Sequence, residues 1–426
     1  MMNSHCTFRY TLLLLIGLFV ACSDQFSGVL FKSQSPHERY QNQLSNAGLE
    51  RSLLYRQWLQ ASMQSLTDPT MVTIPHQELA YIARDKPTAI GYAFMARRGE
   101  RLLIDVSVNS KDSVQLFIDL FEAPPDTAIR PKRLVSADTA TTITWDVRQD
   151  GQYLLRIQTE LLAELSFRLQ LTAEASLATP VIPSARQHIG SIFGDVRDGG
   201  RRKHEGIDIF AARHTPVVAA TDGVVRVGNN RLGGKVVWLR AKDRPLNLYY
   251  AHLDSQLVIS GQSVSGGDTL GFIGNTGNAR TTPPHLHFGI YGRNGAIDPL
   301  PFLRPGKSKP PAISADTSRI GDTLRSTQPL LPDASPHIPL LVEATYRDGY
   351  RVVLPDSSKH FVAQKRVSPL SRLRPLRLTD GRYLYAQPDT TAARITELEA
   401  GLQTQIIAEY LDFLLVEGPV RGWVRR

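Results

Sequence analysis

The chain has 426 residues, too many for one ordinary domain, and this length predicts roughly two to four domains. Its composition, 42% hydrophobic and 21% charged, is that of a soluble globular protein. The formal net charge of +9 is spread over small clusters, so it fits attraction to any polyanion without selecting one. We find no phosphate-binding glycine loop and no recognisable nucleic-acid motif, and we therefore expect no nucleic-acid partner.

The start of the chain has the pattern of an export leader. Arg9 precedes an apolar run from about Leu12 to Ala21, which is shorter than the roughly 20 residues that span a bilayer. The run has the length of a secretory signal core. It ends at Cys22 in a sequence that resembles the bacterial lipobox, whose cysteine is lipidated, although Phe19 stands where that motif usually has leucine. We expect export to the cell envelope or periplasm, with membrane attachment through Cys22; an ordinary cleaved signal peptide or an uncleaved anchor is the alternative.

Cysteine usage limits the chemistry of the rest of the chain. The two cysteines, Cys6 and Cys22, both lie in the leader. The remainder therefore has no disulfide and no cysteine-based metal site. A metal site there must use histidine and carboxylate side chains.

The segments after the leader change from helical to strand-like patterning. Apolar residues at helical spacing predict a helix within 38–66. Short alternating runs over 88–172, broken by Gly, Pro, Asn and Asp, favour a β-sandwich. Its "DGQYLLRIQ" resembles the closing hairpin of pre-peptidase-type β-sandwich modules. Residues 185–303 are again β-rich and contain many glycines, whereas 304–336 contains six prolines among polar residues, as a linker would.

The C-terminal part resembles bacterial SH3-like barrels, above all in its closing "GWV". Cell-wall or peptide binding is the functional interpretation, and a barrel that only packs on its neighbour is the alternative. We therefore predict a mainly β, multidomain chain with an N-terminal helix. Its predicted parts are a leader (1–22), a helical linker region (23–75), a β-sandwich (76–175), an antiparallel β-sheet domain (185–303), a Pro-rich linker (304–336), a candidate divergent SH3-like segment (337–370) and an SH3-like barrel (371–426).

The stretch "PPHLHFGIY" places two histidines one residue apart in a predicted strand. Side chains at i and i+2 of a strand share one face, so His285 and His287 project together. A second pair, His204 and Asp208 in "HEGIDIF", also has an even spacing and would share a face if this segment is a strand. Two histidines and the aspartate would make a tetrahedral zinc site with one open position, which is typical of a catalytic site.

A third motif, "LYYAHLD", places His252 in another strand-like run, so these motifs contain more histidines than one metal needs. The surplus histidines could move protons or stabilise an oxyanion. An H-x-H or H-x-x-x-D pair alone is a weak signal, but the ordered set resembles the lysostaphin/LytM-type zinc metallopeptidases, which cut peptide bonds in bacterial peptidoglycan. The resemblance covers about residues 186–303 and includes the flanking "SIFGDVRDGG" and "GGDTLGFIGNTGN".

By position, the resemblance implies His204, Asp208 and His287 as ligands of one Zn²⁺ per chain. It implies His252 and His285 as the catalytic histidines, beside the metal-bound water and the scissile carbonyl. The implied fold is a compact antiparallel β domain with a narrow groove over the metal.

Three functions follow from these patterns. The first is a zinc endopeptidase that hydrolyses peptide cross-links in peptidoglycan. The second is a non-catalytic or autoinhibited envelope scaffold that binds cell wall and activates other hydrolases. The third is a binding module whose other β domains do the main work. Retention of all five motif residues favours the first.

Overall fold

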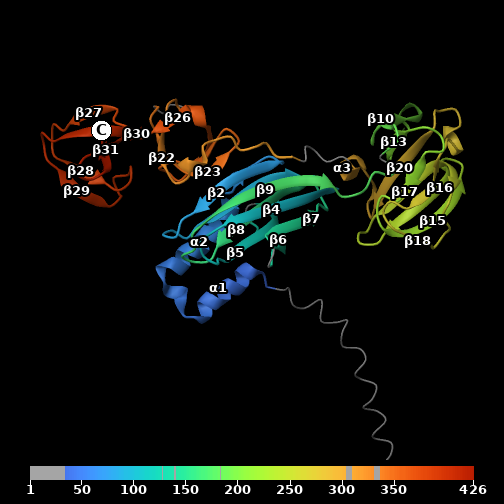
Figure 1. Cartoon of the computed structure of the whole chain (residues 1–426), viewed down its shortest axis with the longest axis horizontal. Coiled ribbons are helices and arrows are strands. Elements are labelled where there is room, and N and C mark those ends of the chain that lie inside the picture. Colours follow the sequence, from blue (N-terminus) through green and yellow to red (C-terminus); the bar gives the residue numbers. More distant parts are fainter. Residues whose placement is uncertain (1–33, 127, 139–140, 183, 304–308, 331–335) are drawn as a thin grey trace, which may run out of the picture. The chain divides into compact units, whose positions relative to one another are not determined.

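The computed structural model describes residues 34–126, 128–138, 141–182, 184–303, 309–330 and 336–426. The chain is mainly β, as predicted, and its strands form several sheets (Figure 1). Within the described part of the chain, no helix has both the length and the apolar character needed to cross a membrane. The predicted leader and Cys22 lie outside the described residues.

Two helices occupy the predicted helical region. Helix α1 (Pro36–Asn46) begins with a capping box, in which the Ser35 hydroxyl accepts from the Glu38 N–H and the Glu38 carboxylate accepts from the Ser35 N–H. The described residues up to Arg51 belong to one compact unit, and those from Ser52 onward belong to another. Helix α2 (Leu53–Thr67) belongs to the second unit and packs there on the first sheet, where the buried Trp58 indole donates to the carbonyl of Thr159.

The region predicted as a sandwich forms two sheets that share one apolar core. In the second sheet, the strands Glu100–Asn109 and Leu165–Ala175 alternate between buried and more exposed positions. In the first sheet, the strands Ala89–Ala96, Leu116–Glu122 and Gly151–Thr159 are buried along most of their length. The first sheet has the order β1 (Thr70–Met71), β3 (Ala89–Ala96), β8 (Gly151–Thr159), β5 (Leu116–Glu122) and β6 (Lys132–Ser136). The second contains β2 (His76–Ile82), β9 (Leu165–Ala175), β4 (Glu100–Asn109) and β7 (Thr142–Asp146).

A segment more than 250 residues further along the chain extends the second sheet. Strand β23 pairs antiparallel with β2, so that Leu79 lies opposite Thr345. The added strands are β23 (Pro339–Tyr346), β24 (Gly349–Val353) and β25 (Lys359–Ala363), with β22 (Thr323–Ser326) and β26 (Val367–Pro369) beside them. The SH3-like assignment of 337–370 stays a prediction, but this segment completes a sheet that begins at residue 76.

A buried charge cluster links these distant strands. The guanidinium of Arg351 on β24 donates to Glu78 on β2 (3.1 Å) and to Glu343 on β23 (2.6 Å). Glu78 also accepts from the hydroxyl of Tyr92, and its other oxygen lies 3.2 Å from His76 Nε2. Burial alone would raise the pKa of Glu78, but Arg351 and its other partners lower it to about 2. Both charges of the Glu78–Arg351 pair are fully buried.

The central sheet contains the predicted metal and catalytic residues. Its strand order is β10 (His188–Ser191), β13 (Ile207–Phe210), β20 (His285–Gly292), β17 (Asn247–Gln256), β16 (Gly234–Ala241), β15 (Gly223–Asn230) and β18 (Ser263–Val264). Strands β14 (Pro216–Val218), β19 (Thr269–Ile273) and β21 (Gly295–Ile297) pair at its margins, and helix α3 (Leu300–Leu303) follows. One face packs on a core that includes Leu248, Tyr250 and Phe288. The opposite face is therefore available for a site.

The last sheet lies within the predicted SH3-like barrel. Its order is β27 (Arg374–Arg377), β30 (Gln403–Tyr410), β31 (Phe413–Glu417), β32 (Gly422–Arg425), β28 (Arg382–Tyr385) and β29 (Arg394–Leu398). Trp423 and Val424 of the "GWV" motif are buried in it. The SH3-like assignment and the predicted domain boundaries remain predictions.

We predict that Arg351→Met destabilises the second sheet by about 3–5 kcal/mol, because it leaves Glu78 buried without its cation. Amide hydrogen exchange of β2 and β23 should become faster. The exposed Arg421–Glu417 pair provides the control, since Arg421→Met should change stability by less than about 1 kcal/mol. Equal amide hydrogen exchange rates in the two variants would show that the buried pair contributes nothing to the stability of the sheet.

The same cluster predicts a pH dependence. The folded pKa of Glu78, about 2, lies below its ordinary value of 4.5, so the unfolded chain takes up a proton first as the pH falls. The stabilisation should be complete above pH 4.5 and should disappear as the pH approaches 2. The amide hydrogen exchange rates of β2 in the native protein and in Arg351→Met should therefore converge as the pH falls through this interval.

Candidate active site

The pairing of β13 with β20 brings two of the predicted ligands together. Asp208 is the direct cross-strand partner of His287, and directly opposed residues on antiparallel strands share a face. The carboxylate Oδ1 of Asp208 lies 3.0 Å from His287 Nδ1. The predicted H-x-H and H-x-x-x-D motifs are thus joined by sheet register.

His204 reaches the same point from outside the strand. We expected a strand through His204, but β13 begins at Ile207, so His204 lies in the segment before it. Its Nε2 is 3.1 Å from Asp208 Oδ1 and 2.9 Å from His287 Nδ1. Gly206 permits this close approach, because a Cβ there would lie 2.8 Å from the imidazole of His287 and 2.5 Å from the carbonyl oxygen of Phe288.

These three side chains fit a divalent metal. Their ligand atoms all lie within 4.8 Å of one another, and the side chains are largely buried. A tetrahedral zinc ion with ligand bonds of about 2.0–2.2 Å separates its ligand atoms by roughly 3.3 Å, close to the distances found here. Two imidazoles and one carboxylate would leave one tetrahedral position for water or substrate.

Backbone carbonyls fix the orientation of three histidine rings. The Nδ1 atoms of His204, His252 and His285 lie 2.9 Å from the carbonyl oxygens of Ile192, Thr276 and Pro283, respectively. A carbonyl can only accept, so each Nδ1 carries the proton. In this tautomer Nε2 is the acceptor atom of the ring, which is the arrangement that a metal ligand or a general base requires.

Arg197 orients Asp208, one of the three predicted ligands, and was not anticipated from the sequence. Its guanidinium donates to Asp208 Oδ2 (2.8 Å) and to the Ser191 hydroxyl (2.6 Å). Ser191 in turn donates to Asp195. Arg197 therefore occupies one carboxylate oxygen of Asp208 and leaves Oδ1 facing the two histidines. An arginine seven residues before His204 has no spacing rule that would have identified it.

A local change of backbone direction places His252 in the site. Tyr249 and Ala251 face the same side as His287, whereas Leu248 and Tyr250 are buried on the other side, so alternation would send residue 252 into the core. His252 instead has φ +62°, at a point where the pairing of β16 with β17 is irregular. This bulge re-aims the side chain, as bulges near active sites commonly do. The rings of His252 and His285 have centroids 5.0 Å apart.

Burial controls the charge of these groups. It lowers the pKa of His252 to about 4, with a further contribution from His285, so this ring is neutral at pH 7. Burial likewise lowers the pKa of His287, although Asp208 opposes it. For Asp208, burial would raise the pKa, but the adjacent imidazoles of His204 and His287 hold it far below its ordinary value. Asp208 is therefore ionised, and it lies beside a ring, that of His287, whose pKa is lowered.

The five residues share one hollow of about 920 Å³. Trp238, Tyr249 and Tyr291 form an aromatic group on its floor, with Trp238 and Tyr249 centroids 4.4 Å apart. His214 lies outside it, exposed and 3.3 Å from an Asp254 oxygen. Glu205 lines the hollow, and its carboxylate accepts from the Tyr291 hydroxyl at 3.3 Å.

Comparison with known proteins identifies this part of the chain. Residues 202–299 match the model of Peptidase family M23. The chain contains an M23 peptidase domain. The match includes all five predicted site residues and leaves the flanking sheets outside it. The sequence resemblance to lysostaphin/LytM-type peptidases is thereby confirmed.

Relatives of the M23 domain include named endopeptidases. The chain is 41% identical over 127 residues to the L-Ala–D-Glu endopeptidase of Bacillus subtilis, covering 27% of this chain and 39% of the relative. It is 38% identical over 107 residues to the glycyl-glycine endopeptidase ALE-1 of Staphylococcus capitis, covering 24% and 29%. It is 44% identical over 115 residues to the uncharacterized lipoprotein YgeR of Escherichia coli, covering 26% and 43%. The chain thus spans less than half of each of these relatives.

Among solved structures, the M23 domain is similar to the catalytic domain of lysostaphin from Staphylococcus simulans. The two sequences are 32% identical, and the match covers 28% of this chain and 92% of that domain with a TM-score of 0.26.

We predict that His204→Ala abolishes stoichiometric metal binding, whereas His285→Ala retains it, since His285 lies outside the donor cluster. Metal content after equilibrium dialysis against zinc, read by atomic absorption, tests this. One metal per native chain is expected. Equal metal loss in both variants would contradict the division of roles.

We further predict that Arg197→Gln weakens metal binding about 10- to 100-fold, because Asp208 loses the partner that orients it. Competition with a chromophoric chelator measures the affinity. Arg197→Lys should lose less metal affinity, since lysine retains the positive charge near Asp208. Unchanged affinity in Arg197→Gln would show that His204 and His287 alone position the carboxylate.

Proposed function

We propose that this protein is a zinc-dependent endopeptidase that hydrolyses peptide cross-links in bacterial cell-wall peptidoglycan. The observation that carries the proposal is the convergence of five side chains on one hollow. Three of them offer donor atoms to one metal position, and two more histidines stand beside them with free Nε2 atoms. The endopeptidase names of the M23 relatives supply the substrate class.

We propose the following roles for these residues. His204, Asp208 and His287 would hold the zinc ion, which when bound lowers the pKa of a water molecule and polarises a carbonyl. His252 is neutral at pH 7, so its Nε2 can accept a proton from the attacking water. The ring of His285 adjoins that of His252, and once its Nε2 has taken up a proton it can donate a hydrogen bond to the oxyanion of the tetrahedral intermediate.

The names of the relatives specify different bonds, one between L-Ala and D-Glu and another between two glycines. We therefore define the substrate by class, as a peptide cross-link. We also propose that the protein is exported to the cell envelope, as the sequence of its leader indicates. Lipidation at Cys22 belongs to the same proposal, and a relative named a lipoprotein supports it.

We predict that the native protein with zinc releases peptide-cleaved products from purified peptidoglycan, detected by mass spectrometry. His285→Ala and His252→Asn should lower turnover about 10²- to 10⁴-fold with metal content unchanged. Asparagine is chosen at position 252 because it tolerates the left-handed backbone found there.

The outcome against the proposal is a native chain that binds zinc and wall material and cleaves nothing. That result would favour the scaffold function. A native chain that cleaves, together with full activity of His285→Ala, would retain the enzyme and reject the role of His285.

A further inference from the structure

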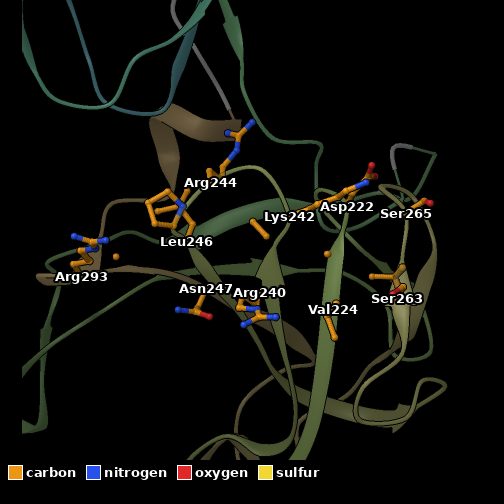
Figure 2. Close-up of a pocket in the computed structure, with 15 residues that line it drawn as sticks. Asp222, Val224, Arg240, Lys242, Arg244, Leu246, Asn247, Ser263, Ser265 and Arg293 are labelled. Atoms are coloured by element: carbon orange, nitrogen blue, oxygen red, sulfur yellow. The ribbon is translucent and has the colours of Figure 1, made fainter. Parts of the chain in front are cut away.

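A second hollow lies on the same face of the central sheet. Its volume is about 860 Å³, and nothing so far assigns it a ligand (Figure 2). It is lined by Arg240 on β16, Asn247 on β17, Val224 on β15 and Arg293 in the turn after β20. Figure 2 shows these side chains around one opening.

Sheet register connects this hollow to the metal cluster through successive rows of cross-strand partners. Ala251 pairs with His287, and His287 pairs with Asp208. Two residues further along the strands, Trp238 pairs with Tyr249. Directly opposed residues share a face and successive rows alternate, so every second row faces the same side.

The next row on this face lines the second hollow. Asn247 pairs with both Arg240 and Tyr291, and Arg240 pairs with Val224. Four strand residues separate this row from the one that contains His287, which is about 13 Å at ~3.3 Å per residue. Tyr291 also lines the first hollow, so the two hollows adjoin on one continuous face.

The second hollow is cationic. Arg240, Lys242 and Arg293 are exposed, and within the described part of the chain no carboxylate pairs with them. Two other charged residues line it and are already engaged. Arg244 donates to Asp146, and Asp222 accepts from the N–H of Gly266. The hollow therefore presents three exposed positive charges against the one carboxylate of Asp222.

We propose that this basic hollow binds a carboxylate of the substrate peptide, about four residues from the bond cleaved at the metal cluster. This inference rests on the proposed endopeptidase function and defines its substrate further, as an acidic peptide. An extended peptide advances about 3.3–3.6 Å per residue, so four residues span the distance between the rows. Trp238 and Tyr249 provide an apolar floor for the intervening residues.

The chemistry of the lining matches this ligand. Arginine binds a carboxylate through two parallel hydrogen bonds, and the amide of Asn247 can donate a further one. A groove with one sign of charge also raises the local concentration of an oppositely charged substrate. A peptide without the carboxylate should bind the protein with lower affinity.

The test compares the double variant Arg240→Gln/Arg293→Gln with the native chain on soluble peptidoglycan fragments. Each fragment is used untreated and after its carboxylates have been converted to amides. On untreated fragments the double variant should raise KM about tenfold, because each exposed ion pair contributes up to about fivefold. On amidated fragments the two proteins should have the same KM.

Arg186→Gln is the matched control, since Arg186 is an exposed arginine of the same domain that lines neither hollow. It should keep the native KM on both substrates. Zinc content and kcat should be unchanged within about twofold in all these proteins. An equal rise in KM on both substrates, or no rise at all, would overturn the proposal.

A binding measurement separates this proposal from the proposed function. Fluorescent fragments are titrated into His285→Ala with and without the two arginine substitutions. Weaker binding of untreated fragments alone supports the carboxylate site even where the native protein cleaves nothing. Equal binding of untreated and amidated fragments overturns the proposal. The proposal also fails if inorganic polyphosphate binds and is displaced equally by untreated and amidated fragments, because the hollow would then be a site for a phosphate polymer.

Discussion

The site depends on the antiparallel pairing of β13 with β20. This pairing places Asp208 directly opposite His287, and the carboxylate and imidazole are then held by two backbones rather than by flexible side chains. A shift of one residue in register would turn one of the two side chains to the apolar core, so the burial of Ile207, Ile209, Leu286 and Phe288 on the other face fixes the register. The same core packing that stabilises the sheet therefore positions the candidate ligands.

The other site residues require departures from regular strand geometry. His204 approaches from a non-strand segment, over a glycine that admits the ring of His287. His252 adopts a left-handed backbone that is unfavourable for a non-glycine residue, and it does so next to the site. Carbonyl oxygens at Ile192, Thr276 and Pro283 then fix three rings in the tautomer that leaves Nε2 free. The strands thus place the side chains, and the loops fix the orientation and tautomer of the histidine rings.

The open face of the central sheet carries three different surfaces in order. The metal cluster lies at one end, the aromatic side chains lie in the middle, and three exposed cations lie at the other end. Because strand side chains alternate, every second residue of β16, β17 and β20 contributes to this face. A linear substrate laid along the strands would meet these surfaces in a fixed order. A sheet floor is well suited to this use because its row spacing matches that of an extended peptide.

The sequence by itself determined the β-rich class, the absence of cysteine chemistry after the leader, and the five histidine and aspartate positions, because strand periodicity and motif order are local properties. It also led to an error at His204, because strand alternation was extended to a residue that lies before the start of β13 at Ile207. Arg197, the bulge at His252 and the basic hollow could not be read from it, since each depends on which strands pair and in what register. The addition of residues 339–363 to the sheet of β2 is of the same kind, as its buried Glu78–Arg351 pair joins positions 273 residues apart. Tertiary structure decided these features because contacts between distant segments are set by core packing, and local sequence carries no record of them.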